Sequence, residues 1–406
     1  MRVLLVNKFH YLKGGSEKYY FELAELLKEH GHTVAFFSMK NDKNLKTGDK
    51  EYFVDEIDLN TGSKLKAFDI IYSKTNRKLM EKALDEFKPD IVHINNFQRQ
   101  LSASIIKPIK KRNIPIVFTA HDLQAVCPNI SMLDSQNEIC EKCMRGKYIN
   151  CAKKKCIKNS TLKSVLGALE GYYYRTNSIY TKKIDYIITP SYFYKDKLIE
   201  DGISKDKIKA IHNSIDVNIY DIQISDGEYA LYVGRLVKEK GIIDLVKAFN
   251  KIRNKKLYIA GEGPARSEIE EYIKSNKLED RVLLLGHLSA PEIKEKISNC
   301  TFVVVPSIWY ENCPYSILET LAIGKPIIGA NIAGIPELVK DNETGLLYAS
   351  GNVDELSEKI NILFKDKTLI EKLSKNAKEF AKIEFLKEKY YQEILDIYNS
   401  LRKEEK

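Results

Sequence analysis

Residues 302–319 read Phe-Val-Val-Val-Pro-Ser-Ile-Trp-Tyr-Glu-Asn-Cys-Pro-Tyr-Ser-Ile-Leu-Glu. The first four residues form an unbroken apolar run, which is typical of a strand buried on both faces of a parallel sheet. A more polar loop follows, and a helix is expected to begin near Tyr315. The segment therefore predicts a strand–loop–helix unit.

The same unit recurs on both sides of this segment. Strands that alternate with helices form parallel sheets covered by helices on both faces. We therefore predict an α/β fold of two tandem doubly wound, Rossmann-like domains. The expected strands are residues 3–6, 33–37, 91–94, 114–119 and 186–189, then 229–233, 257–260, 282–285, 302–305 and 326–329, with helices of the second series starting near Lys240, Pro264, Ala290 and Tyr315.

A polar stretch without clear periodicity, 213–228, separates the two series. We expect a first domain at 1–216, interrupted by a cysteine-rich insert at 123–160, and a second domain at 226–384. Residues 385–406 are expected to form a helix that packs back on the first domain. Because ligands of open parallel sheets bind outside the carboxyl ends of the strands, two such domains predict a binding cleft between them.

The composition is that of a soluble globular protein. The 406 residues are 44% hydrophobic and 30% charged, which is too apolar for a disordered chain. No apolar run approaches the ~18 residues that cross a bilayer, and residues 1–7 lack the apolar core and cleavage site of a signal peptide. The chain is therefore expected to be cytoplasmic and in a reducing compartment.

Three common phosphate or metal motifs are absent from the sequence. Gly261-Glu262-Gly263 follows a strand, but Arg266 occupies the third glycine position of a dinucleotide fingerprint. Gly324-Lys325 is followed by Pro326, so it is not a Walker P-loop. No Asp-x-Asp triplet occurs. NAD and ATP chemistry are therefore disfavoured, and neither a cofactor nor a catalytic metal is expected.

Two clusters in the first domain sit where strands end. Gly14-Gly15 follows the first strand, where glycines let a backbone approach a ligand and the next helix offers free N–H groups to an anion. A plain tight turn is the alternative. His121 follows the strand at 114–119, where it can hydrogen-bond a sugar hydroxyl, although a loop histidine with structural bonds is the simpler interpretation.

Gly234-Arg235-Leu236-Val237-Lys238-Glu239-Lys240-Gly241 follows the first strand of the second domain. Arg235 and Lys240 can converge on one anion, since a guanidinium supplies a fork and an ammonium a mobile point charge. That pair suits a diphosphate, whereas the alternative is two solvated charges at a helix start.

The quoted segment carries two glutamates eight residues apart. Glu311 lies in the loop and Glu319 about one turn into the helix, so one carboxylate can meet a sugar ring and the other a ribose diol. The helix start near Ser316 presents N–H groups to phosphate. The spacing alone is common by chance, but its position across a helix start favours a binding site.

Together these clusters resemble the retaining GT-B glycosyltransferases of the group 1 family (glycosyltransferase family four). That family has an N-terminal glycine loop, a G-R-L-x-x-x-K-G motif and an E-x7-E motif on the same two-domain plan. The resemblance covers nearly the whole chain and is strongest at 230–348. It implies transfer of a sugar from a nucleotide-sugar donor to an acceptor, with retained anomeric configuration and no metal at the reacting centre.

The resemblance also implies roles for individual residues. Arg235 and Lys240 would bind the donor diphosphate, Glu311 would hold the transferred sugar, and Glu319 the ribose. The backbone N–H of Ser316 would contact phosphate.

In the first domain, Gly14 and Gly15 would let the chain close on the donor, and His121 would lie beside the reacting sugar. One departure is Pro314, because the family commonly has Glu-Gly-Phe-Gly where this chain has 311–314. Pro314 has no N–H, so one backbone donor is missing, which bears on donor identity more than on reaction type.

The expected function is transfer of a hexose to a polysaccharide or lipid-linked acceptor in cell-envelope assembly. Two alternatives remain open at this point. A sugar-nucleotide epimerase of the same architecture would consume the donor without an acceptor. A nucleic-acid-binding protein would use the basic insert, but it leaves the Glu311–Glu319 and Arg235–Lys240 clusters unexplained, so nucleic acid is not an expected partner.

The net charge of +9 is unevenly distributed. Residues 1–210 carry 37 Lys and Arg against 25 Asp and Glu, whereas the remainder is slightly acidic. The stretch 142–163 holds eight basic residues and no acidic one, and an amphipathic, tyrosine-edged segment follows it. This pattern suits an anionic membrane surface near the acceptor. The alternative is a helix that buries its apolar side in its own domain.

Five cysteines lie in the insert, and three states are open to them. Paired cysteines two to four residues apart are compatible with a structural zinc site, whereas the odd count and short spacing favour reduced thiols over a metal or disulfides. The five are Cys127, Cys140, Cys143, Cys151 and Cys156.

Overall fold

The computed structural model describes residues 1–57, 66–220 and 227–403. The chain forms two compact units, Met1–Ile211 with Tyr391–Lys406, and His212–Tyr390. The expected domain start at residue 226 and the last three residues of the expected C-terminal helix lie outside the described residues.

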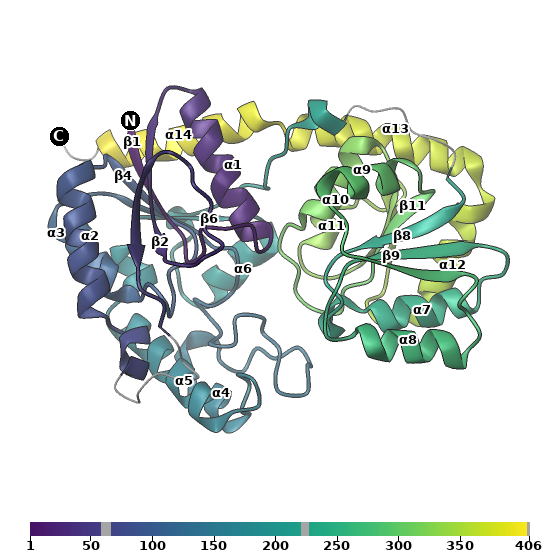
Figure 1. Cartoon of the computed structure of the whole chain (residues 1–406), viewed down its shortest axis with the longest axis horizontal. Helices are drawn as coiled ribbons and strands as arrows, with labels where there is room; N and C mark the ends of the chain where they lie inside the picture. Colours follow the sequence, from purple (N-terminus) through teal and green to yellow (C-terminus); the bar gives the residue numbers. More distant parts are fainter. Residues whose placement is uncertain (58–65, 221–226, 404–406) are drawn as a thin grey trace. The chain divides into compact units, whose positions relative to one another are not determined.

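The N-terminal unit is built on a parallel sheet of seven strands in the order β3-β2-β1-β4-β5-β6-β7 (Figure 1). Strands β1, β4 and β5 are fully buried at their centres, as their unbroken apolar runs require. The strands are β1 (Arg2–Val6), β2 (Thr33–Met39), β3 (Lys50–Val54), β4 (Ile91–Ile94), β5 (Ile116–Thr119), β6 (Tyr186–Thr189) and β7 (Ile208–Ala210).

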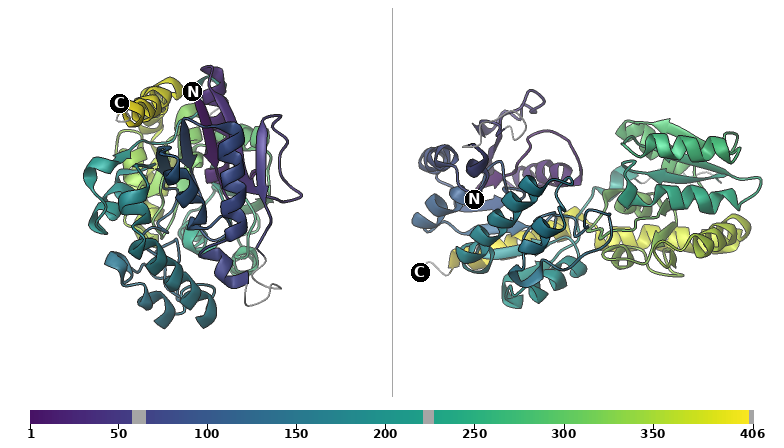
Figure 2. Two further views of the ribbon diagram at one scale, coloured as in Figure 1. Left: turned by 90° about the vertical axis from the view of Figure 1, so that its left-hand side faces the viewer. Right: turned by 90° about the horizontal axis from the view of Figure 1, so that it is seen from below.

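Helices flank this sheet on both faces (Figure 2). The last helix, α14 (Lys387–Lys403), runs along the N-terminal unit, where Tyr391 stacks on His30 with ring centroids 3.6 Å apart and Lys209 pairs with Glu393 at 3.0 Å. The other helices are α1 (Gly15–Glu29), α2 (Lys74–Phe87), α3 (Ile106–Lys111), α4 (Ile149–Lys153), α5 (Thr161–Thr176) and α6 (Tyr192–Glu200).

The C-terminal unit has a parallel sheet of six strands in the order β10-β9-β8-β11-β12-β13. Its buried apolar residues form one core cluster between the sheet and its helices. The elements are β8 (Tyr229–Val233), α7 (Ile242–Asn250), β9 (Lys256–Ala260), α8 (Arg266–Ser275), β10 (Val282–Gly286), α9 (Ala290–Ser298), β11 (Phe302–Val305), α10 (Tyr315–Ile323), β12 (Ile327–Ala330), α11 (Ile335–Leu338), β13 (Gly345–Tyr348), α12 (Val353–Lys365) and α13 (Lys367–Glu384).

The predicted fold of two doubly wound α/β domains is confirmed. Every expected strand is present within two residues of its expected bounds. Three strands were not predicted: β3, β7 and β13. The first two are edge strands of the N-terminal sheet and the third is an edge strand of the C-terminal sheet, and edge strands are often short, as β7 and β13 are with three and four residues.

The cysteine-rich insert forms a small core of its own, made by Cys143, Tyr148, Cys151, Ile157 and Ala168 with their neighbours. All seven cysteines are free thiols, and within the described residues no group of three or more His, Cys, Asp or Glu side chains is arranged to hold a metal ion. Burial raises the pKa of the Cys151 thiol to about 12. Cys143 and Cys151 are buried in this small core, and Cys156 packs against it.

Candidate functional site

Lys240 and Glu311 come together at the carboxyl-end side of the C-terminal sheet. Lys240 ends a short 3₁₀ turn after β8, and Glu311 lies in the loop after β11, the strand beside β8. The Lys240 Nζ is 2.6 Å from Glu311 Oε1. Both predicted motifs therefore contribute to one charged contact.

Glu311 is almost fully buried, with 5% of its surface exposed. Its Oε1 accepts hydrogen bonds from the Ser307 hydroxyl at 2.5 Å and from the Trp309 ring N–H at 2.8 Å, in addition to Lys240. Burial acts to raise the pKa of Glu311, but Lys240 and these donors outweigh it and hold that pKa below its ordinary value. An ionised carboxylate is thus fixed by three donors that all meet its Oε1.

The backbone joins the two motifs independently of their side chains. The Ile308 N–H donates to the Glu239 carbonyl at 3.0 Å. Gly241 has φ +67°, and a Cβ there would lie 1.9 Å from the Pro306 carbonyl oxygen. Glycine is therefore required at the end of the G-R-L-x-x-x-K-G motif, both for its left-handed backbone and for this approach.

The remaining residues of the C-terminal unit predicted to bind the donor lie in the same two motifs as Lys240 and Glu311, and each has its own surroundings. Arg235 is exposed in the turn after β8. Glu319 lies in the second turn of α10 and accepts a hydrogen bond from the Tyr220 hydroxyl at 3.2 Å. Ser316 lies in the first turn of α10, whose N-cap residue is Pro314 and which has no side-chain cap, so the helix start can receive an anion.

In the N-terminal unit, His121 and Asn95 follow the neighbouring strands β5 and β4. His121 Nε2 is 2.9 Å from Asn95 Oδ1. Burial lowers the pKa of His121 to about 3, so the ring is neutral near pH 7. The Asn95 amide nitrogen is buried without a hydrogen-bond partner in the described part of the chain.

A buried hydrogen-bonded chain lies beneath His121. His93 Nδ1 is 2.6 Å from the Tyr398 hydroxyl, and its Nε2 is 2.7 Å from Thr119 Oγ1. The Tyr19 hydroxyl also meets Thr119, at 3.0 Å, and the Tyr19 ring packs edge-on against His121 with centroids 4.6 Å apart. The C-terminal helix thus supports the site through Tyr398.

Sequence reasoning missed Asn95, His93 and Tyr398 as site residues. Asn95 directly follows the carboxyl end of a strand, and this position would have been enough to predict it from the sequence. His93 sits inside an apolar run, and its partner Tyr398 is 305 residues away, so only the folded chain brings them together.

Gly14 and Gly15 form the start of α1 after the first strand. Gly14 is the N-cap residue, with φ −171° and no side-chain cap, and both glycines are exposed. A Cβ at Gly14 would meet only Glu17 Oε2, at 3.7 Å, which is an ordinary contact. The fold itself therefore accepts a side chain at Gly14.

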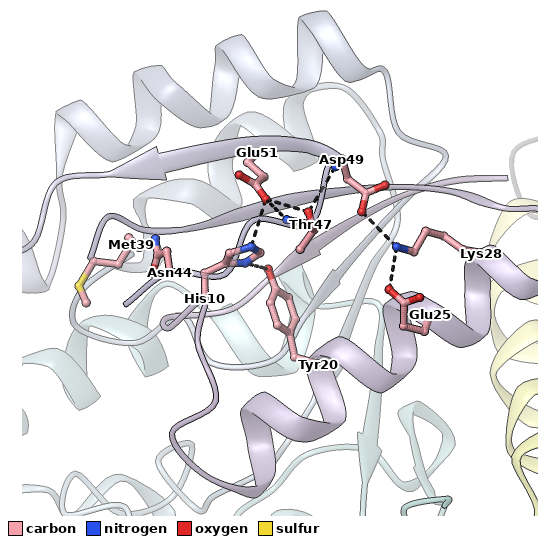
Figure 3. Close-up of polar contacts among 9 residues, drawn as sticks. All are labelled: His10, Tyr20, Glu25, Lys28, Met39, Asn44, Thr47, Asp49 and Glu51. Carbon is pink, nitrogen blue, oxygen red and sulfur yellow. Dashed lines mark hydrogen bonds and ion pairs between the residues drawn. The ribbon is translucent and has the colours of Figure 1, made fainter. Parts of the chain in front are cut away.

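The loop that carries these glycines is anchored by His10 (Figure 3). The His10 side chain is fully buried, with Nδ1 3.4 Å from the Tyr20 hydroxyl and Nε2 3.4 Å from Glu51. Burial lowers the pKa of His10, although Glu51 opposes that shift. The ring is enclosed by aromatic side chains of Tyr20, Phe21, Phe36 and Phe53.

Within the described residues, none of the helices combines the length and hydrophobicity needed to cross a bilayer.

Sequence profiles of two glycosyltransferase families match the chain in tandem. "Glycosyltransferase Family 4" matches residues 13–219, and "Glycosyl transferases group 1" matches residues 218–380. The two matches meet at the junction between the two units.

Individual relatives are distant. An uncharacterized glycosyltransferase of Methanocaldococcus jannaschii is 32% identical over 54% of this chain and 61% of its own length. An uncharacterized 42.6 kDa protein in the cps region of Klebsiella pneumoniae is 26% identical over 83% and 87%. The capsular polysaccharide biosynthesis glycosyltransferase CapM of Staphylococcus aureus is 28% identical over 50% and 54%. Apart from the Klebsiella protein, the chain spans only about half to three fifths of these relatives.

Solved structures share the fold along the whole chain. Sucrose-phosphate synthase from Thermosynechococcus elongatus is 20% identical with a TM-score of 0.76, and covers 98% of both chains. HepE of Anabaena in complex with UDP-glucose is 17% identical with a TM-score of 0.72, over 98% of this chain and 100% of that one. The "Glycosyltransferase Family 4" profile alone matches half of the chain, and the chain shares the fold of these solved structures. This chain therefore belongs to the group 1 glycosyltransferases of family 4, with the GT-B fold.

Proposed function

We propose that this chain is a retaining hexosyltransferase that uses a nucleotide-sugar donor and needs no metal ion at the reacting centre. The observation that carries the proposal is the buried Lys240–Glu311 contact beside the uncapped start of α10. It combines a cation and open N–H groups for phosphate with a fixed carboxylate for sugar hydroxyls.

The chemistry follows from these groups. In the net reaction, the bond between the anomeric carbon and the diphosphate oxygen breaks, the acceptor oxygen forms the new bond to that carbon, and the acceptor hydroxyl proton is released, while negative charge builds up on the departing diphosphate. Arg235 and Lys240 stabilise that charge, and preorganised charge of this kind is often the largest catalytic contribution. Glu311 accepts hydrogen bonds from the transferred sugar, while Glu319 accepts them from the ribose.

The N-terminal unit would contribute neutral hydrogen-bonding groups. A neutral His121 would exchange a hydrogen bond with a sugar hydroxyl without adding a charge. Gly14 and Gly15 would leave room for the donor at the start of α1.

For the acceptor we propose a cell-envelope polysaccharide or a lipid-linked glycan, reached from the cytoplasm. The support is the relative CapM, whose name places it in capsular polysaccharide biosynthesis.

We also propose that the N-terminal unit contacts an anionic membrane surface. Helix α5 does not bury its whole apolar side, because Leu162, Val165, Leu169 and Tyr172 are 66%, 38%, 45% and 36% exposed. Their spacing places them along one side of the helix. Nearby lysines are exposed and form no ion pair with described residues: Lys142, Lys147, Lys153, Lys155 and Lys158. Apolar side chains beside unpaired cations suit an anionic interface.

A thermal-shift screen against UDP-, GDP- and ADP-sugars tests the donor proposal. One nucleotide class should stabilise the protein, and Glu319→Ala should remove most of that stabilisation. Glu358→Ala, an exposed glutamate on α12 of the same unit, is the matched control. Stabilisation that survives Glu319→Ala contradicts the ribose role. Donor consumption without acceptor and without nucleotide release would favour the epimerase instead.

A further inference from the structure

A hollow of 420 Å³ lies in the C-terminal unit at the amino ends of the sheet strands, whereas Glu311 lies at their carboxyl ends. Its walls include Lys255, Thr301 and Lys325, which lie just before strands β9, β11 and β12, whereas Glu311 follows the end of β11. The volume falls in the range of roughly 300–1,000 Å³ that is usual for small-ligand sites. The hollow is therefore separate from the proposed donor site.

The walls of the hollow are strongly basic. Five lysines and one glutamate line it: Lys255, Lys325, Lys367, Lys375, Lys378 and Glu371. Lys367 and Lys375 form no ion pair with any described residue. A concave wall with such an excess of positive charge concentrates counter-ions, so it favours a bound anion.

Two helices fix this wall. Lys367, Lys375 and Lys378 lie on one side of α13 by their spacing. Lys325, only 4% exposed, follows Gly324 at the end of α10. Gly324 has φ +88°, and a Cβ there would lie 3.4 Å from the Ser374 carbonyl of α13, so the two helices meet closely at the hollow. The lysines are thus held on packed elements.

The hollow also has an apolar side. Phe364 of α12, Ile323 and Ile370 line it. The Lys255 Nζ lies 5.0 Å from the centroid of the Phe364 ring, and that ring packs on Phe302 with centroids 4.8 Å apart. A planar or apolar group can pack on Phe364 if Lys255 moves from the ring to the anionic part of the ligand.

We propose that this hollow is a second ligand site, which binds a small phosphorylated molecule with a planar or apolar portion, such as a nucleotide. The lysines supply charge-assisted hydrogen bonds to phosphoryl oxygens, and Phe364 supplies the surface for the rest of the molecule.

Isothermal titration calorimetry with pyrophosphate and with ADP tests this site. The background is Arg235→Ala/Lys240→Met/Glu311→Gln, which removes both cations proposed to bind the donor diphosphate, and the variants below distinguish the remaining binding in the hollow from residual binding at the donor site. Both probes should bind, and Lys367→Ala/Lys375→Ala should weaken them about tenfold, as expected for the loss of charge-assisted hydrogen bonds. These two lysines are exposed, so the variant should fold normally.

The matched control is Lys372→Ala/Lys382→Ala, which removes the same charge from exposed positions of α13 outside the hollow. Phe364→Leu should weaken ADP but leave pyrophosphate unchanged. The proposal is overturned if neither probe binds in the background variant, or if the control weakens binding as much as the substitutions in the hollow. Both outcomes are independent of whether the donor proposal holds.

Discussion

Glu311 is a buried carboxylate whose charge depends on Lys240. Removing one partner of a buried ion pair costs about 3–5 kcal/mol, because the other charge is left without compensation. We therefore expect Lys240→Met to lower the free energy of unfolding of the C-terminal unit by about 3 kcal/mol. Lys240→Met/Glu311→Gln should recover more than half of that loss. Urea unfolding followed by fluorescence of Trp309, the only tryptophan, measures it. A double variant no more stable than Lys240→Met would contradict this interpretation.

A substitution at Gly14 distinguishes a structural requirement for glycine from a functional one. Its backbone is extended and a methyl group there meets only an ordinary contact, so Gly14→Ala should change the melting temperature by less than about 2 °C. The same substitution should lower kcat/KM by about tenfold or more, because the methyl group takes space that the donor needs. Gly202→Ala, at φ +104°, is the contrast, since it should destabilise the protein without a direct effect on the donor. A fully active Gly14→Ala enzyme would remove the functional argument.

At the residue scale, the sequence predicts charged groups better than their supports. Lys240 and Glu311 stand out because they follow buried strands that are neighbours in a doubly wound sheet. Ser307 and Trp309, which hold the Glu311 carboxylate, are ordinary loop residues by composition. Their role depends on the directions in which their side chains point within the nine-residue loop 306–314. A loop has no helical or strand periodicity from which those directions could be predicted.

At the element scale, α5 gives the clearest test of membrane contact. Each basic residue near an anionic surface contributes about 1 kcal/mol, and exposed apolar side chains add to this. The protein should therefore bind phosphatidylglycerol vesicles at low salt and release them at high salt. Leu162→Ser/Leu169→Ser should weaken binding severalfold, whereas Ile383→Ser, a 70% exposed position on α13, should not. Equal binding of all three proteins, or none, would refute the contact.

The sequence predicts the central strands of both sheets but misses three edge strands. Buried central strands such as β8 and β11 are unbroken apolar runs, so the sequence predicts their first and last residues correctly. The edge strand β3 has a partly buried, alternating pattern that starts with Lys50, and it resembles the polar loop before it. Its assignment depends on pairing with β2, which is a tertiary contact.

At the scale of the whole molecule, the two units should respond oppositely to mild acid. Burial lowers the pKa of His93 and of His121 to about 3, so the unfolded N-terminal unit binds protons first as the pH falls below about 6.5 and the unit loses stability. Burial acts to lower the pKa of His212, but bonds to Glu337 and Glu384 outweigh it and raise that pKa. Its contribution to the C-terminal unit is thus present in full below pH 6.5 and is lost as the pH rises.

Hydrogen exchange, corrected for the intrinsic effect of pH, measures the two units separately. Between pH 7.5 and 5.5, protection should fall in β4 and β5 and hold or rise around His212. His212→Gln should abolish the second effect and leave the first. A parallel loss of protection in both units would contradict the assignment.

The most direct test of the donor site uses Trp309, which hydrogen-bonds Glu311 beside Lys240. Titration with nucleotide-sugars should give a saturable change in its fluorescence for one nucleotide class. Lys240→Met, checked for folding by circular dichroism, should raise the Kd about tenfold or more, since a charge-assisted hydrogen bond contributes about 1.5–3 kcal/mol. Lys247→Met on α7, where the lysine side chain is 44% exposed and pairs with Asp244, should bind as the unaltered protein does. If no nucleotide-sugar changes the fluorescence, or if Lys240→Met binds as tightly as the unaltered protein, Lys240 and Glu311 do not form a donor site.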